Sequence, residues 1–541
     1  MPKSNPKYIF VVGGVMSSVG KGVVSASIAK LIQARGYNIA SIKCDMYVNV
    51  DAGTIRPAEH GEVFVGEDGV EADQDLGNYE RFTNQICTLT NYITTGQVYQ
   101  EVIRRERNLE YGGEDVEVVP DVPKEIIRRI ELCQTKTGAD VVVTEFGGTV
   151  GEYQLLLFLE AARMMKVNSP DDVLIVMVSY LPTPSLLGEQ KSKPTQYAIR
   201  TLNSAGLTPD FIFARADEPV TEDIRQTISN VCSIPKEHIV SSPNVDFIYE
   251  VPLVFEKQNL GDELLEALKL KLSKPKLDDW EALVAKIKDV EEEVTIGIVG
   301  KYFNMKSCRD TYISVIESLY HACWANNRRP KIKWLDSEVY ENEPEKLKEL
   351  SELDGIVVPG GFGERGTEGM ILAAQYAREN KIPYLGLCLG MQIMSIEFAR
   401  NMCGLEGANS EELNPETPHP VIHIMEEQKK HMAESNYGAT MRLGAYPCDL
   451  VEGTKSFAAY GKKSISERHR HRYEFNNSYR DQMQAKGFVL AGINPDQDLV
   501  EIAEIKDHPF MVGSQFHPEF KSRPLNPHPL FRDFIKAAVE K

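Results

Sequence analysis

Pro383-Tyr-Leu-Gly-Leu-Cys-Leu-Gly-Met-Gln392 is the most informative stretch of the chain. An apolar run typical of a buried strand stops abruptly at Cys388, and a glycine stands two residues before and two residues after that cysteine. Small neighbours permit a sharp turn that lifts the thiol out of the sheet and directs the next backbone N–H at whatever the sulfur attacks. The alternative is a core cysteine, because free cysteines are among the most buried residues and usually inert.

A base and an acid follow in Gly513-Ser-Gln-Phe-His-Pro-Glu-Phe520. Residues i and i+2 of a strand share one side, so Glu519 is expected to hold the His517 imidazole while the ring takes the thiol proton. In Val357-Val-Pro-Gly-Gly-Phe-Gly-Glu-Arg-Gly366 a further strand runs into glycines, whose N–H groups are expected to form an oxyanion hole with the amide of Leu389. The three segments together favour a catalytic cysteine over core packing.

The N-terminus predicts a phosphate-binding loop. Tyr8-Ile-Phe-Val-Val12 reads as a first buried strand, and Gly13-Gly-Val-Met-Ser-Ser-Val-Gly-Lys-Gly22 leads from it into a helical pattern. Backbone N–H groups at a helix N-terminus attract phosphate, and Lys21 adds a positive charge over the outer phosphates. The match to a Walker A loop is imperfect, because five residues instead of four separate its glycines and Gly22 stands where the magnesium-binding Ser or Thr is expected.

Magnesium must therefore be held elsewhere. Asp75 and Glu145 are the candidates, with Asp73 nearby, and one or two carboxylates suffice when phosphates and water complete the shell. Glu145 ends a buried strand at a Gly-Gly turn, where ligands of α/β proteins collect. A second cluster, Gly188-Glu-Gln-Lys-Ser-Lys-Pro-Thr-Gln196, offers two lysines and two hydroxyls at the start of a helix and reads as a triphosphate clamp.

Composition narrows the class of protein. The 541 residues carry a net charge of −19, which argues against a nucleic acid partner because binding to a phosphate backbone needs a basic face. Nine cysteines without a CxxC pair fit a reducing, cytoplasmic location better than a disulfide framework or a zinc site. The apolar run at residues 8–12 is too short for a signal peptide or a membrane span, so no membrane association is expected.

The C-terminal motifs Pro-Gly-Gly-Phe-Gly, Gly-Leu-Cys-Leu-Gly-Met-Gln and Phe-His-Pro-Glu resemble those of class I glutamine amidotransferases. That resemblance implies hydrolysis of glutamine through a thioester, with release of ammonia. Nearly the whole chain is similar to the CTP synthase family. The motifs that carry this likeness are residues 13–22, Lys43-Cys-Asp-Met-Tyr-Val-Asn-Val-Asp51, His60-Gly-Glu-Val-Phe-Val65, Asp75-Leu-Gly-Asn-Tyr-Glu-Arg-Phe82, Glu145-Phe-Gly-Gly-Thr-Val-Gly151, Lys191-Ser-Lys-Pro-Thr-Gln196 and Arg468-His-Arg-His-Arg-Tyr-Glu474.

The family resemblance implies a two-step reaction. ATP phosphorylates the uracil 4-oxygen of UTP, and ammonia then displaces the phosphate to give CTP. Lys21 and Lys43 would serve the phosphoryl transfer, with Asp75 and Glu145 as Mg²⁺ ligands. The resemblance also implies activation by GTP, inhibition by CTP, and a homotetramer built as a dimer of dimers.

Binding residues follow from the same resemblance, position by position. Those for ATP are Ser18, Val19, Gly20, Lys21, Gly22, Val23 and Asp75. Those for UTP and CTP are Ser17, Glu152, Tyr153, Gln154, Lys191, Ser192, Lys193, Pro194, Thr195 and Gln196. Those for glutamine are Gly361, Leu389, Gly390, Met391, Gln392, Glu412 and Arg472, with Arg472 as the fork for the substrate carboxylate. His60 matches a position along the ammonia passage, and residues 436–444 match the lid that responds to GTP.

Some positions depart from the family pattern. Glu152-Tyr-Gln154 replaces the usual Asp-Ile-Glu that faces the pyrimidine of bound CTP, residues 113–117 are more acidic than usual, and Thr227 stands where a lysine is common. These changes remove attraction for an anion or alter base recognition, so weaker or shifted CTP inhibition is expected. The stretch between Lys301 and Asp310 is also longer than in relatives, which bears on GTP activation.

We therefore predict an α/β protein of two doubly wound domains, an N-terminal P-loop-like nucleotide domain and a C-terminal class I glutamine amidotransferase domain. The predicted ranges are 1–271 for the amidoligase, 272–293 for a charged helical linker and 294–541 for the glutaminase. Two other classes of protein stay open. A cobyrinate-type amide synthetase would lack the Lys-Ser-Lys-Pro-Thr-Gln loop in this context, and a non-catalytic assembly protein would have lost Cys388, Lys21 or Glu145.

Overall fold

The computed structural model describes residues 5–56, 59, 61–184, 188–301, 308–425, 428–430 and 438–541. By their internal contacts these residues form two units, one of residues 1–52 and 75–284, the other of residues 53–74 and 285–541. No sequence pattern indicated that residues 53–74 belong with the C-terminal half, since the predicted amidoligase domain spans 1–271. Helix α11 (Asp278–Asp289) falls within the predicted linker. No described helix is long and apolar enough to cross a membrane.

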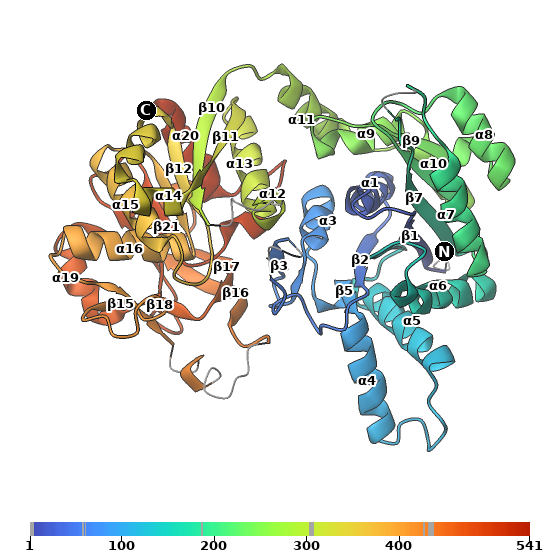
Figure 1. Ribbon diagram of the computed structural model, residues 1–541, viewed down its shortest axis with the longest axis horizontal. Coiled ribbons are helices and arrows are strands. Elements are labelled where there is room, and N and C mark those ends of the chain that lie inside the picture. Colours follow the sequence, from blue (N-terminus) through green and yellow to red (C-terminus); the bar gives the residue numbers. More distant parts are fainter. Residues whose placement is uncertain are drawn as a thin grey trace. The chain divides into compact units, whose positions relative to one another are not determined.

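The first unit is built on a seven-stranded, wholly parallel sheet (Figure 1). Its order is β5 (Tyr92–Thr94), β2 (Ile39–Asp45), β6 (Val141–Phe146), β1 (Lys7–Gly13), β7 (Val173–Tyr180), β8 (Phe211–Arg215) and β9 (Ile239–Ser242). Every residue of β1, β2 and β6 is buried, as expected for parallel strands covered on both faces. Phe10 and Val12 of β1 pack against helices α4 to α7 on one face.

The helices of this unit are α1 (Lys21–Ala34), α3 (Asp75–Thr83), α4 (Thr95–Arg107), α5 (Val118–Thr137), α6 (Leu156–Asn168), α7 (Lys193–Ser204), α8 (Glu222–Cys232), α9 (Val251–Glu256) and α10 (Leu260–Ala267). Of these, α1 and α7 begin in the two segments where a helix start was predicted, after the phosphate loop and within residues 188–196. The order of the sheet places β6 beside β1 and β2 on the other side of β6, and the carboxyl ends of β2, β6 and β1 carry Lys43, Glu145 and the phosphate loop, respectively. Ligands of open α/β sheets bind at this edge.

The second unit has a nine-stranded mixed sheet. Its order is β11 (Arg329–Asp336), β10 (Glu293–Gly300), β12 (Gly355–Val358), β13 (Tyr384–Leu387), β21 (Met511–Ser514), β20 (Val500–Ile505), β19 (Phe488–Ile493), β16 (Arg442–Leu450) and β17 (Ser464–His471). The first five strands run parallel and the last four join in antiparallel pairs. Two doubly wound α/β units are thus present, as predicted.

Helices cover both faces of this mixed sheet (Figure 1). One face packs on α13 (Ile313–Ala325) and α20 (Pro529–Glu540), the other on α15 (Thr367–Glu379) and α16 (Leu389–Asn401). Shorter helices are α12 (Cys308–Thr311), α14 (Ser337–Asn342), α18 (Lys455–Tyr460) and α19 (Arg480–Gln484). A small sheet joins β14 (Asn409–Ser410), β15 (Pro420–Ile424) and β18 (Tyr473–Phe475), and β3 (Val63–Val65) pairs with β4 (Glu71–Asp73).

The turn after β13 leaves no room for side chains at its glycines. A Cβ at Gly386 would lie 2.5 Å from the backbone C and O of Gly390. We expect Gly386→Ala to lower the thermal unfolding midpoint of the second unit by roughly 5–10 °C, because a packing clash of about 3 kcal/mol has that effect in a domain of this size. Calorimetry checks this, with Gly151→Ala as control because a Cβ there meets nothing within 4 Å. Equal midpoints for the two variants would contradict it.

Candidate active sites

Cys388 occupies a strained turn between β13 and α16. Its φ is 49° and its ψ is −98°, a conformation that costs a non-glycine residue free energy. The two glycines explain how the turn is accommodated, because a Cβ at Gly390 would lie 2.1 Å from the Val358 carbonyl oxygen and one at Gly386 would meet Gly390. The predicted nucleophile elbow is therefore present, and the reading of Cys388 as an ordinary core cysteine does not account for the strain.

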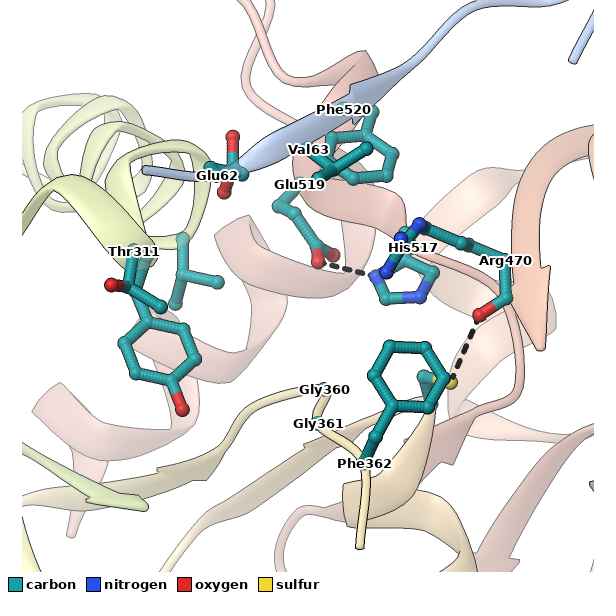
Figure 2. Close-up of a pocket in the computed structure, with 13 residues that line it drawn as sticks. Glu62, Val63, Thr311, Gly360, Gly361, Phe362, Arg470, His517, Glu519 and Phe520 are labelled. Carbon is teal, nitrogen blue, oxygen red and sulfur yellow. Dashed lines mark hydrogen bonds and ion pairs between the residues drawn. The ribbon is translucent and has the colours of Figure 1, made fainter. Parts of the chain in front are cut away.

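His517 and Glu519 form a hydrogen-bonded pair beside the cysteine. The Nδ1 atom of His517 lies 2.7 Å from Oε1 of Glu519 (Figure 2). Both residues are buried, but the predicted reason for their pairing was wrong: β21 ends at Ser514, and His517 precedes a 3₁₀ turn, Pro518–Lys521. The tight turn, not strand alternation, brings the acid back onto the imidazole.

The electrostatics of this pair favour a charged imidazole. Burial lowers the pKa of His517. Its interactions with Glu519 and Cys388 have the opposite and larger effect, so the pKa is raised to about 10. A methyl group at Gly360 would lie 2.8 Å from Cε1 of His517 and 3.7 Å from Cβ of Cys388, so that glycine lets base and nucleophile approach. A charged imidazole beside a cysteine is the environment in which catalytic thiols are activated.

Two cavities meet at Cys388. One of about 760 Å³ is lined by Gly361, Gln392, Glu412 and Arg472 among others, which are four of the residues predicted to bind glutamine. The other three, Leu389, Gly390 and Met391, lie in the first turn of α16, where the Met391 N–H already donates to the Cys388 carbonyl oxygen at 3.1 Å and those of Leu389 and Gly390 precede the first helical hydrogen bond. The Met391 side chain is part of the core under the sheet. A second cavity, of about 80 Å³, is lined by Cys388, His517 and Glu519 together with Glu62 and Val63 (Figure 2).

The first unit carries a separate charged site at the end of β1. The side chain of Lys21 donates to the Gly148 carbonyl oxygen at 2.9 Å, and burial lowers its pKa. Lys43 is ion-paired with Asp75, and its Nζ lies 3.7 Å from Oε1 of Glu145. The Tyr79 hydroxyl donates to Oε2 of Glu145 at 2.5 Å. Buried lysines and carboxylates that converge on a phosphate loop suit phosphoryl transfer.

The pair of predicted magnesium ligands fits a divalent cation. Burial, together with the nearby charge of Asp75, raises the pKa of Glu145 to about 8. A cation between the two carboxylates would relieve this repulsion. No cluster of three or more metal-binding side chains was found among the described residues, so water and phosphate oxygens would complete the shell. Asp73 belongs to the other unit and is not part of this group.

Comparison with known proteins identifies the family of each half of the chain. Residues 7–270 match the family described as CTP synthase N-terminus, and residues 307–537 match glutamine amidotransferase class-I. The CTP synthase of Carboxydothermus hydrogenoformans is 51% identical over 99% of this chain and 99% of its own. That of Bacillus subtilis is 47% identical with the same coverage. The chain belongs to the CTP synthase family.

Among solved structures, the chain is similar to the Trypanosoma brucei CTPS glutaminase domain with bound acivicin. The two are 41% identical, and the match covers 46% of this chain and 94% of that chain with a TM-score of 0.43. Members of the CTP synthase family use ATP and glutamine as substrates.

Some of the phosphate-loop residues that are predicted to bind nucleotide are exposed to solvent. Ser17 and Ser18 are exposed, Val19 is buried, and Ser18 and Gly20 have positive φ, of 56° and 87°. Gly20 precedes α1, whose first residues are Lys21, Gly22 and Val23. The N-terminus of this helix follows the loop directly, as predicted for a phosphate cradle.

The side chain of Asp75 explains why position 22 is a glycine. A Cβ at position 22 would lie 1.9 Å from Oδ1 of Asp75, so the carboxylate fills the space that a Walker A Ser or Thr would need. This contact fits the prediction that a carboxylate from elsewhere in the chain takes the place of the Walker hydroxyl as an oxygen ligand. The sequence revealed the missing hydroxyl but not which residue replaces it.

The predicted triphosphate clamp is only partly exposed. Lys193 is exposed at the start of α7, and Lys191 pairs with Glu189 at 3.0 Å. Pro194 is half-buried. The other three residues face inward: Thr195 Oγ1 is bonded to Ser179 at 2.9 Å, and Gln196 donates to the Ser192 hydroxyl at 3.0 Å.

Residues 152–154 form their own hydrogen-bonded turn. Glu152 accepts hydrogen bonds from the backbone and hydroxyl of Thr149 at 2.8 and 2.9 Å, and from the Gln154 amide at 2.7 Å. The Tyr153 side chain is 89% exposed. Glu152 is therefore engaged by its own loop.

Two arginines of the Arg-His-Arg-His-Arg run have roles that sequence reasoning missed. Alternation along β17 turns Arg468 and Arg470 toward residues 53–74, where Arg470 pairs with Glu71 at 2.8 Å and Arg468 with Glu67 at 3.3 Å. Only Arg472 was assigned from sequence. The sequence did offer a signal for this role: Arg468 and Arg470 are two residues apart, and residues at that spacing lie on the same side of a strand. Among the other predicted positions, His60, residues 302–307 and the first two of the lid, 436 and 437, lie outside the described residues.

The Gly22–Asp75 contact yields a test. We expect Gly22→Ser to reduce CTP formation about 100-fold with either glutamine or ammonium as nitrogen source, because it displaces Asp75 by about 1 Å or more. Gly22→Ala is the matched control and should lose as much, since volume and not the hydroxyl causes the effect. Spectrophotometric assays measure both. A serine variant as active as the parent, with alanine inactive, would refute the exchange of ligands.

Proposed function

We propose that this chain converts UTP to CTP, with ATP and glutamine as co-substrates. The overall reaction takes UTP, ATP, glutamine and water to CTP, ADP, phosphate and glutamate. One observation carries the proposal: a strained cysteine with a His–Glu pair lies in the same chain as a phosphate loop with converging lysines and carboxylates. The cysteine site would supply ammonia, and the phosphate-loop site would activate UTP to receive it.

Glutamine hydrolysis begins with the Cys388 thiolate attacking the side-chain amide carbon. The C–N bond breaks as His517 gives its proton to the leaving nitrogen, and ammonia departs from a thioester. Water then adds to the thioester and releases glutamate and the thiol. Backbone N–H groups of Leu389 and Gly361 would receive the oxyanion, and Arg472 and Glu412, which line the larger cavity, would bind the substrate's carboxylate and amine.

Phosphoryl transfer is assigned to the first unit. Lys21 and Lys43 would neutralise negative charge on the transferring group, and Ser18 to Val23 would hold ATP. A magnesium ion held by Asp75 and Glu145 would add further charge stabilisation when bound. Ser17 and residues 191–196 would hold the UTP triphosphate, with residues 152–154 near its base. The 4-oxygen of UTP becomes a phosphate leaving group, which ammonia displaces.

Ammonia is proposed to leave Cys388 through the cavity of about 80 Å³. Its walls include Glu62 and Val63, which follow the His60 position that matches the family's ammonia passage. Further proposals rest on the family alone. These are activation by GTP, inhibition by CTP, a homotetramer and a cytoplasmic location.

The division of labour gives a direct test. We expect Cys388→Ala to abolish glutamine-dependent CTP formation, at least about 10⁴-fold as for removal of a nucleophile, while ammonium-dependent formation persists. Cys403→Ala, a half-buried cysteine outside the site, is the control and should keep both activities. Loss of the ammonium-dependent reaction in Cys388→Ala would contradict the proposal.

Inhibition by CTP is proposed to be weak because of residues 152–154. Restoring Asp-Ile-Glu by the triple change Glu152→Asp, Tyr153→Ile and Gln154→Glu should lower the half-inhibitory CTP concentration about tenfold, the effect of one added hydrogen bond. The measurement is a CTP titration at saturating UTP. If the unchanged chain is already inhibited at CTP levels well below its UTP half-saturation, the idea fails.

A further inference from the structure

Gln515 is a buried side chain at the reactive sulfur that the hydrolysis steps above do not use. It lies between the end of β21 and His517 and is 1% exposed. Its Nε2 is 3.6 Å from Sγ of Cys388. Resting on the proposed glutaminase function, we propose that Gln515 stabilises the Cys388 thiolate by donating a hydrogen bond to its sulfur.

The orientation of the Gln515 amide follows from its neighbours. The Gln392 amide Nε2 donates to the Tyr473 carbonyl oxygen at 3.1 Å, and a carbonyl can only accept. The same Nε2 faces Oε1 of Gln515 at 3.3 Å, so that atom of Gln515 must be the acceptor. The remaining group, the NH₂, then points at the sulfur as a donor. Two amides and one carbonyl thus fix a donor at Cys388.

The sulfur lies between two partners that prefer opposite protonation states. The Arg470 carbonyl oxygen is 3.9 Å from Sγ and accepts the S–H of a neutral thiol (Figure 2). The N–H of Gln515 favours the thiolate instead, because hydrogen bonds to charged acceptors are the stronger ones. Gln515 therefore offsets the preference of the carbonyl for the protonated form.

The backbone holds Gln515 in place. Its N–H donates to the Glu501 carbonyl oxygen of β20 at 2.8 Å. The Glu501 side chain is itself held by Arg442 at 2.7 Å and His469 at 2.8 Å, all in the interior. A donor supported in this way keeps its position when the thiol loses its proton.

One other side chain reaches the sulfur. The charged and titratable groups that line the two cavities at Cys388 are Arg56, Glu62, Tyr312, Glu412, Arg470, His471, Arg472, Tyr473, His517 and Glu519. Of these, His517 also bonds to Cys388, but it gives up its proton during hydrolysis, whereas the amide of Gln515 keeps its N–H throughout.

The test measures the thiolate directly. In the full-length protein, iodoacetamide alkylation of Cys388 is followed from pH 5 to 10 by mass spectrometry of its peptide. Gln515→Met keeps length and removes the donor. The pH of half-maximal alkylation should rise by about one unit, and kcat/KM for glutamine at pH 7 should fall about tenfold, as expected for one hydrogen bond to a charged atom. Ammonium-dependent CTP formation should stay unchanged.

Two further variants separate this role from packing. Gln515→Asn keeps the amide but is one methylene short of the sulfur, so it should shift alkylation in the same direction. Ser395→Ala removes a buried hydroxyl from α16 that bonds to Met391, away from the sulfur, and should shift nothing. An unchanged alkylation midpoint in both Gln515 variants overturns the inference. A parent protein that hydrolyses no glutamine and whose Cys388 does not alkylate overturns the proposed function instead.

Discussion

The positive φ of Cys388 is the constraint on which the second unit is organised. A residue in that conformation ends β13 and starts α16 within one position, so the thiol and the first free N–H of the helix point into the same space. The turn is possible only because its flanking glycines let the backbones of β13, β12 and α16 approach within contact distance. Substrate subsite, base and oxyanion donors are then all placed relative to this one turn.

The first unit is constrained differently, because it holds two carboxylates close together in a buried site. Asp75 and Glu145 repel each other beside two lysines, and Tyr79 gives one of the carboxylates a neutral partner. Such a group costs folding free energy unless a cation and phosphates complete it. Strain at Cys388 and repulsion at Glu145 are therefore comparable: each site departs from the most stable local structure where its chemistry requires it.

Much of this was predictable from sequence because periodicity and glycine positions report backbone geometry. The buried strands, the elbow at Cys388 and the cradle before Lys21 all follow from local patterns. What escaped prediction depends on contacts between distant residues. Nothing near Gly22 shows that Asp75 fills its space, and nothing near Gln515 shows that Gln392 orients its amide. His517 and Glu519 were paired correctly for the wrong reason, because i and i+2 also meet across a 3₁₀ turn.

Contacts of the segment 53–74 give the arginine run at 468–472 a role that could not be predicted from the run itself. In the sequence this segment belongs to the nucleotide half, yet Arg468 and Arg470 hold it through Glu67 and Glu71, and Glu62 is bonded to Ser314. Arg470 and Glu71 are both buried, and a buried pair holds a geometry better than an exposed ion pair does. Glu62 and Val63 also line the smaller cavity at Cys388, so the contacts of this segment fix one wall of that cavity. Two arginines of the run therefore hold a segment that lines the cavity, a role separate from the substrate binding proposed for Arg472.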